Sequence, residues 1–355
     1  MQSKRSLADY VQFTAAHAPR MWEAIWKPDK ELGQGFEQLT IPLGDDPDGE
    51  TDICATLVRY LPEGTDKAQW SQRPAMLYVH GLSDYFFQDH LARHYHDQGF
   101  AFFAVDLRKC GRSLRPGQHA HYATNMLFYV TDLNAAVDQI PHTHQGITVM
   151  AHSTGGLIVP LWVDYLRRNH NERHYRLQAM VLNSPWLGMR IVTKGTLGAT
   201  KMAARILGRV APHMRVPIKP MTAYGESLHK DHRGEWSFNK NLKPIAGVPV
   251  YFGWLKAVIE GQDVVHSGRV DCGIPIFVLC SQKSWLNKPY STKTNHADVV
   301  LNAADIRRWS AALGDDVSVH SIKGARHDVF LSLAKPRAEA FEACDAWLRE
   351  HVAAA

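Results

Sequence analysis

Residues 147–156 read ITVMAHSTGG and place a serine between an apolar run and a segment with helical spacing. The apolar run predicts a buried strand, and the residues after the serine predict a helix. Ala151 and Gly155 lie two positions before and after Ser153, and such small residues leave room for a sharp turn. A serine on a strand–turn–helix of this kind is typical of a nucleophile. An ordinary strand–helix turn is the alternative.

Short apolar runs alternate with segments of helical spacing on both sides of this turn. Strands this short and this continuously apolar are typical of a parallel sheet that helices cover on both faces. Two segments near the start of the chain predict a hairpin ahead of that sheet. The predicted strands are 36–41, 52–61, 75–79, 100–105, 146–151, 178–182, 274–280 and 317–322, and the predicted helices are 88–98, 124–140, 154–168, 303–312 and 334–351.

Residues 185–271 interrupt this alternation. They contain glycine, proline and many aromatic residues, and they match no continuation of the strand–helix pattern. We expect a largely helical insertion that caps a core formed by residues 1–184 and 272–355. Within that core, residues 1–35 are expected to form a helical extension at the N-terminus.

The stretch that follows the predicted strand 75–79 reads HGLSD, and its glycine allows the backbone to turn toward the serine. We therefore expect the backbone N–H groups of Leu82 and Thr154 to form an oxyanion hole, in which each donor contributes about 3 kcal/mol. His80 is expected to brace this loop and not to act as the base.

The base and the acid are expected late in the chain, where the last strands end. His327 follows the predicted strand 317–322 and is the candidate base. Asp298 precedes a predicted helix and is the candidate acid that orients the imidazole. Asp305 and Asp271 are alternatives for the acid, because the loop before Asp298 is long.

These motifs resemble those of the lysophospholipase and monoacylglycerol lipase branch of the α/β hydrolases, a group that also includes serine aminopeptidase-like sequences. The resemblance covers about residues 75–350 in the order serine, acid, histidine. It implies an α/β-hydrolase fold, with a mostly parallel central sheet flanked by helices, and a helical cap over an acyl pocket. Ala151 and Cys110 depart from the pattern of the family. The matching residues are His80-Gly81, Asp106-Leu107-Arg108, Gly111-Arg112-Ser113, Ser153, Asp298-Val299-Val300, Gly324 and His327-Asp328.

The composition indicates a globular protein: 45% of the 355 residues are hydrophobic, 21% are charged, and the net charge is +5. The five cysteines form no C-x-x-C pair, which is typical of a reducing compartment. Because neither a signal peptide nor a membrane-spanning run stands out, we expect a cytoplasmic protein. We expect no nucleic-acid partner, no cofactor and no metal ion, whereas transient contact with a lipid surface stays open.

The leading hypothesis is a serine hydrolase that cleaves carboxylic esters, with small lipid-like monoesters as substrates. Two alternatives use the same residues differently. An acyltransferase would pass the acyl group to an alcohol or amine, and a catalytically inactive homologue would only bind a ligand beneath the cap.

Overall fold

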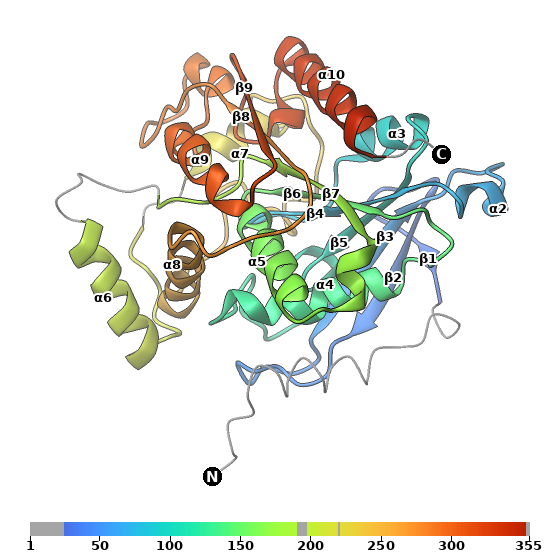
Figure 1. Cartoon of the computed structure of the whole chain (residues 1–355). Helices are drawn as coiled ribbons and strands as arrows, with labels where there is room; N and C mark the ends of the chain where they lie inside the picture. Colours follow the sequence, from blue (N-terminus) through green and yellow to red (C-terminus); the bar gives the residue numbers. More distant parts are fainter. Residues whose placement is uncertain (1–24, 190–196, 219–220, 353–355) are drawn as a thin grey trace.

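The computed structural model describes residues 25–189, 197–218 and 221–352, which form a nine-stranded sheet (Figure 1). The strand order is β1-β2-β3-β5-β4-β6-β7-β8-β9. Strands β4 to β9 pair in parallel, and β1 to β3 add an antiparallel edge next to β5, so the predicted mostly parallel sheet is confirmed. The strands are β1 (Lys27–Pro28), β2 (Phe36–Pro42), β3 (Cys54–Tyr60), β4 (Ala75–Val79), β5 (Ala101–Asp106), β6 (Ile147–His152), β7 (Leu177–Asn183), β8 (Ile276–Ser281) and β9 (Val317–Ile322).

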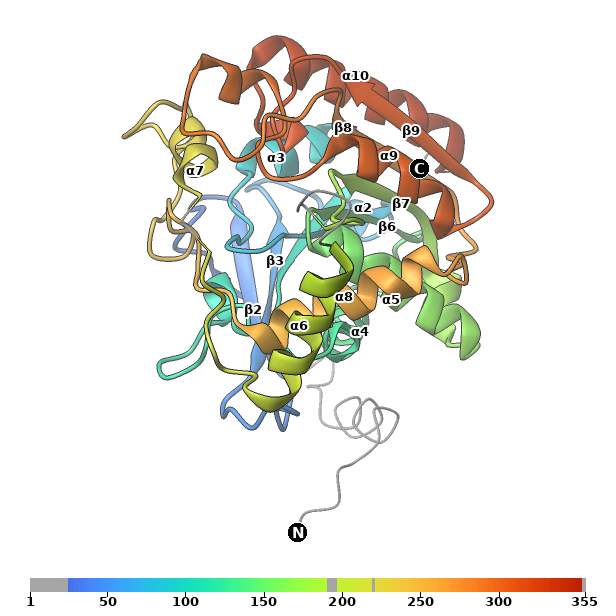
Figure 2. The ribbon, with the colours of Figure 1, turned by 90° about the vertical axis from the view of Figure 1, so that its left-hand side faces the viewer.

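Helices cover both faces of the sheet (Figures 1 and 2). On one face, α3 (Asp89–Asp97) and α10 (Ala334–His351) pack together against the strands. On the other face lie α4 (Tyr129–Asp138), α5 (Gly155–Arg168) and α9 (Ala303–Ser310). A further short helix, α2 (Lys67–Trp70), precedes β4.

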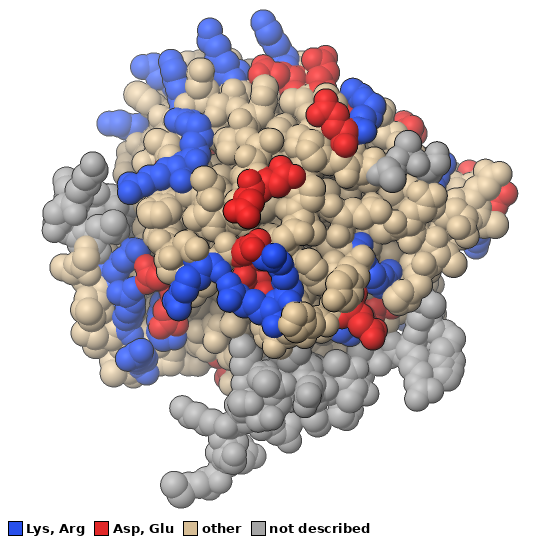
Figure 3. All heavy atoms as spheres, viewed as in Figure 1, with Lys and Arg blue, Asp and Glu red and all other residues tan. Residues whose placement is uncertain are grey.

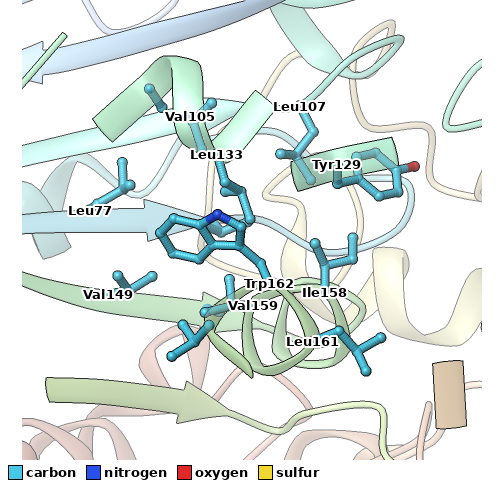
Figure 4. Packing of buried hydrophobic residues seen from close by; sticks show 14 of the residues in the cluster. Leu77, Val105, Leu107, Tyr129, Leu133, Val149, Ile158, Val159, Leu161 and Trp162 are labelled. Atoms are coloured by element: carbon cyan, nitrogen blue, oxygen red, sulfur yellow. The ribbon is translucent and has the colours of Figure 1, made fainter. Parts of the chain in front are cut away.

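Successive side chains of a central strand point to opposite faces of the sheet and join different parts of the core. On β4, Tyr78 contributes to the cluster under α3 and α10, and its neighbour Leu77 contributes to the cluster under α5. The ring of Trp162 on α5 lies among Leu77, Leu133 and Val149 (Figure 4). Its indole N–H donates to Asn134 at 2.8 Å, so this large buried side chain leaves no unsatisfied donor.

The N-terminal edge differs from the sequence prediction. Residues 25–35 contain β1 and turns, and β1 pairs with β2 in antiparallel register. Gly33 and Gly35 have φ angles of 75° and 83°, which a right-handed helix does not allow. The predicted helical extension is therefore wrong for residues 25–35, and its remainder, residues 1–24, lies outside the described residues.

The insertion between β7 and β8 contains α6 (Leu197–Val210), α7 (Thr222–Leu228) and α8 (Phe252–His266) in its described part. Helices α6 and α8 lie side by side, and Lys201 of α6 donates to Asp263 of α8 at 3.0 Å (Figure 2). Helix α7 lies apart from this pair, and residues 229–251 connect it to α8. Across the described ranges, none of the helices has the length and apolar content needed to cross a bilayer.

Candidate active site

Ser153 lies on the turn between β6 and α5. Its φ angle of 53° is in the left-handed region, which residues other than glycine rarely adopt. Its backbone N–H donates to the carbonyl of Asn183 at 3.0 Å, and its own carbonyl accepts from the N–H groups of Gly156 at 3.0 Å and Trp186 at 2.9 Å. These three hydrogen bonds hold a strained turn at the carboxyl ends of the parallel strands, which is the geometry of a nucleophile elbow.

The two glycines after Ser153 are required by close packing. A Cβ atom at Gly155 would lie 2.6 Å from the carbonyl oxygen of His80 and 2.8 Å from that of Val79. A Cβ atom at Gly156 would lie 2.6 Å from the Cβ atom of Pro185. Any side chain at either position would therefore push the start of α5 away from β4 or from the loop after β7.

The structure brings Ser153, His327 and Asp298 together. The Ser153 hydroxyl is 3.0 Å from Nε2 of His327, and Nδ1 of His327 is 2.8 Å from Oδ2 of Asp298. All three residues are buried. With the carboxylate accepting from Nδ1–H, Nε2 is the ring nitrogen that accepts the serine proton, which is the tautomer that general-base catalysis needs.

The Asp298 carboxylate is held from behind by the backbone. Its Oδ1 accepts from the N–H groups of Val300 and Leu301, both at 2.7 Å. The alternative acids lie elsewhere: Asp305 lies in the first turn of α9, where Gly188 leaves room for it, and Asp271 forms an ion pair with Arg167. Of the three predicted candidates, Asp298 is therefore the one that contacts His327.

The loop after β4 lies against the serine. A Cβ atom at Gly81 would be 2.8 Å from the Cβ atom of Ser153. His80 braces this loop, because its Nδ1 donates to the Gly81 carbonyl at 2.7 Å and its Nε2 accepts from the Leu107 N–H at 3.1 Å. In the described part of the chain, the N–H groups of Leu82 and Thr154 donate to no backbone carbonyl.

A family model described as "Serine aminopeptidase, S33" matches residues 71–333. The chain belongs to this serine aminopeptidase S33 family. The match spans the part of the chain that contains the serine, the acid and the histidine described above.

Solved structures share the fold of this S33-family protein. The monoacylglycerol lipase of Paleococcus ferrophilus is 18% identical, with a TM-score of 0.56 over 79% of this chain and 96% of that one. A soluble variant of monoglyceride lipase from Saccharomyces cerevisiae is 15% identical, with a TM-score of 0.57 over 84% and 93%. A hypothetical protein from Pseudomonas aeruginosa is 14% identical, with a TM-score of 0.60 over 92% and 99%. The predicted α/β-hydrolase fold is thus confirmed.

Among curated proteins, phospholipase YtpA of Bacillus subtilis (strain 168) is 25% identical over 139 residues. These residues are 39% of this chain and 49% of that relative, so the chain matches about half the length of the phospholipase.

A small pocket in this S33-family protein lies beside Leu82 and Thr154, the residues of the two predicted oxyanion donors. Its wall includes Gly81, Leu82 and Thr154, and Trp254 reaches it from the insertion. Cys110 also lines the pocket, where its thiol donates to the Arg108 carbonyl at 3.1 Å. Burial raises the pKa of the Cys110 thiol well above its usual range, so it stays protonated and is no competing nucleophile. The remaining lining residues are His80, Leu107, His121, Tyr129 and Ile158.

Two aromatic rings enclose the imidazole of His327. Tyr224 of α7 packs edge-on at a ring distance of 5.4 Å, and the ring of His152 lies at 4.8 Å. Burial lowers the pKa of His152 to about 4, so His152 is neutral near pH 7 and adds no positive charge beside the base. Tyr224 could not be predicted from the sequence, because the stretch that contains it matches no functional motif.

The loop after β5, which carries two of the motifs shared with the family, is fixed by buried ion pairs. Arg112 donates to Asp106 at 2.9 Å and to Asp29 at 2.6 Å. Arg108 pairs with Asp132 at 2.6 Å on α4. The residue between the two ion-paired side chains, Leu107, donates its N–H to His80, so the ion pairs support the loop that His80 braces.

Proposed function

We propose that this protein is a serine hydrolase that cleaves carboxylic esters through an acyl-enzyme. The observation that carries the proposal is the continuous hydrogen-bonded chain from Ser153 through His327 to Asp298, with distances of 3.0 and 2.8 Å. Such a chain activates a hydroxyl that would otherwise be a weak nucleophile at neutral pH.

The geometry supports a two-step reaction. Ser153 attacks the ester carbonyl while His327 takes its proton, and the N–H groups of Leu82 and Thr154 stabilise the oxyanion. His327 then gives the proton to the departing alcohol, which leaves the acyl group on Ser153. Water, deprotonated by the same imidazole, attacks this acyl-enzyme, and the serine is released as the carboxylic acid leaves. Asp298 stabilises the imidazolium that forms in each step.

We further propose small lipid-like monoesters as the substrates, with residues 185–271 acting as the cap of the site. Relatives of similar fold or sequence include proteins named as a monoacylglycerol lipase and a phospholipase. The pocket beside the donors is lined in part by apolar side chains such as Leu107, Ile158 and Trp254, which suit an acyl chain. Tyr224 and Trp254 are the insertion residues that reach the base and the pocket.

Labelling and turnover together test this proposal. We expect a fluorophosphonate probe to modify Ser153 alone, as read by mass spectrometry of peptides, and we expect turnover of a series of nitrophenyl esters of increasing acyl length. Adding alcohols or amines and measuring new esters or amides separates hydrolysis from acyl transfer, and an aminoacyl nitroanilide tests for peptidase action. A protein that neither reacts with the probe nor turns over any ester would be the inactive ligand-binding homologue.

Helix α6 suggests how the protein reaches lipid substrates. Met202, Ile206 and Val210 recur every four residues, which places them on one face, and they are 55%, 54% and 72% exposed. Lys and Arg side chains, with acidic side chains among them, lie where α6 stands at the left of Figure 3. Arg209 of α6 is exposed. The sequence contains no Asp or Glu from residue 173 to residue 225. Asp263 of α8 pairs with Lys201 and Arg205 of α6, so the apolar stripe and the exposed Arg209 beside it are the features of α6 that fit an anionic lipid surface.

We therefore expect the protein to bind vesicles that contain phosphatidylserine more tightly than vesicles of phosphatidylcholine alone. Ile206→Glu should weaken this binding by about tenfold or more, because it removes a large apolar contact and adds a repelled charge. Val319→Glu is the matched control, since Val319 on β9 is also exposed but is remote from α6 in the chain. Co-sedimentation with the two vesicle types measures the effect. Equal binding by all three proteins, or no binding by any, would exclude α6 as a lipid contact.

A further inference from the structure

The loop that presents the Leu82 N–H is held by the insertion. Two residues of this loop receive contacts from residues 243–248, which belong to the long stretch between α7 and α8. Nζ of Lys243 is 2.8 Å from Oδ1 of Asp84, and the backbone N–H of Val248 donates to Oγ of Ser83 at 2.9 Å. The second contact joins residues that are 165 positions apart in the sequence.

The Lys243–Asp84 pair is shielded from water. The side chains of Lys243 and Asp84 are 7% and 2% exposed. Aromatic rings surround the ammonium group: Phe87 lies 5.4 Å from Nζ, and Tyr224 and Phe238 each lie 5.7 Å from it. Removing one partner of such a pair leaves the other charge buried without compensation, so the contact resists separation.

The backbone at Ser83 needs such support. Ser83 has a φ angle of 55°, and it directly follows Leu82, the residue whose N–H is the proposed donor. The Val248 contact holds Ser83 itself, and the Lys243 contact holds the next residue, Asp84. Without them, Ser83 is free to return to a more common conformation, and the preceding residue Leu82, which carries the N–H donor, would shift with it.

The same segment is also fixed to the helix that covers the base. A Cβ atom at Gly225 of α7 would lie 2.5 Å from the carbonyl oxygen of Ile245, so the two backbones are in close contact. The neighbouring residue on α7, Tyr224, packs against His327. Residues 243–248 therefore lie between the oxyanion loop and the helix that contacts the imidazole.

We propose that Lys243 is a positioning residue that holds the oxyanion loop in its productive geometry through Asp84. The inference rests on the proposed function, since it concerns the oxyanion donor of that reaction. It makes docking of residues 243–248 a condition for the Leu82 N–H to point at the substrate oxygen. Lys243 touches no reacting atom, so its loss affects the transition state more than substrate binding.

Steady-state kinetics of Lys243→Met on a nitrophenyl ester provide the test. We expect kcat to fall by about 10- to 100-fold, somewhat less than for outright loss of an oxyanion donor, with KM changed by less than about threefold. Affinity for a trifluoromethyl ketone, which forms an oxyanion on Ser153, should fall by the same factor as kcat/KM. Lys243→Arg should retain most of the activity, because it keeps the charge next to Asp84.

Two variants separate positioning from stability. Lys256→Met removes a lysine of the same insertion that pairs with Glu260 within α8 at 2.9 Å, and it should leave kcat unchanged. The double variant Lys243→Met with Asp84→Leu removes both buried charges, so it should regain thermal stability relative to Lys243→Met without regaining kcat. Return of kcat along with stability would mean that the pair is only structural.

Ser83→Gly extends the test to the second contact and keeps it decisive even where Lys243→Met fails to fold. Glycine tolerates the left-handed φ angle but lacks the Oγ acceptor, so kcat should fall while the fold is retained. Full kcat in folded Lys243→Met or in Ser83→Gly would overturn the proposal. The proposed function fails differently: in that case the wild-type protein itself lacks turnover that depends on Ser153.

Discussion

Replacing Ser153 with alanine is expected to lower kcat for ester hydrolysis by about 10⁶-fold, the size of effect seen when a triad serine is removed. The variant loses the attacking oxygen, whereas the two N–H donors and the imidazole stay in place. The methyl group of alanine fits where the Cβ atom of serine already lies, so the fold should persist. Turnover of a nitrophenyl ester measures the loss of activity, and the thermal unfolding midpoint shows whether the fold persists.

Ser310→Ala is the matched control for this substitution. Ser310 is also fully buried, and its hydroxyl donates to the Ile306 carbonyl within α9 at 2.7 Å. Its removal should change kcat little and cost about 1 kcal/mol of unfolding free energy. Residual turnover by Ser153→Ala near the wild-type rate, in protein free of contaminating esterase, would contradict the assignment of the nucleophile.

Replacing Asp298 with asparagine is expected to lower kcat by about 10⁴-fold, as for loss of a triad carboxylate. The reason lies in how the carboxylate is anchored. Two backbone N–H groups donate to Oδ1, so the amide oxygen of asparagine takes that place and its NH₂ group faces Nδ1 of His327. Nδ1 must then accept, the ring proton moves to Nε2, and the imidazole no longer accepts the proton of Ser153.

The matched controls are Asp305→Asn and Asp271→Asn, which replace the other two acids that the sequence allowed. Neither carboxylate contacts His327, so both variants should keep kcat within a few-fold of wild type. Combining Ser153→Ala with Asp298→Asn should be no worse than Ser153→Ala alone, since the residues act as a unit. A large loss in Asp305→Asn with normal turnover in Asp298→Asn would reassign the acid.

Most of the sheet could be predicted because its strands are continuous apolar runs bounded by turn residues. The predicted strands 75–79 and 317–322 agree with β4 and β9, and other parallel strands differ by one or two residues at their ends. The helix predicted over 124–140 begins later, because residues 126–128 form a 3₁₀ turn before α4. The 3₁₀ turn and the helix share one apolar face, which periodicity alone does not resolve.

The edge strand β1 could not be found in the sequence. Lys27 and Pro28 are both exposed and have no apolar alternation, so the strand exists only through its pairing with β2. Tertiary pairing of this kind leaves no local pattern, and the same segment therefore suggested a helix.

The three residues of the hydrogen-bonded chain could be predicted from the sequence, whereas the residue that supports the oxyanion loop could not. Ser153 stands in a local motif, and His327 and Asp298 follow strand ends at positions that the fold prescribes, so their proximity could be expected. Lys243 has no such signal. Its significance comes from a contact with Asp84 that forms only when the insertion folds back over the core, and a single lysine in a loop gives no hint of that partner.

The separation of Ser153 and His327 along the chain has a consequence for synthesis. The two residues are 174 positions apart, and β8 and β9 must join the sheet before His327 reaches the serine. Translation proceeds from the N-terminus at about 5–20 residues per second, so a nascent chain carries the serine for many seconds without its partner. A ribosome-bound fragment that ends before His327 would lack the proposed base, so we expect ester hydrolysis only after His327 has been synthesised and β8 and β9 have joined the sheet.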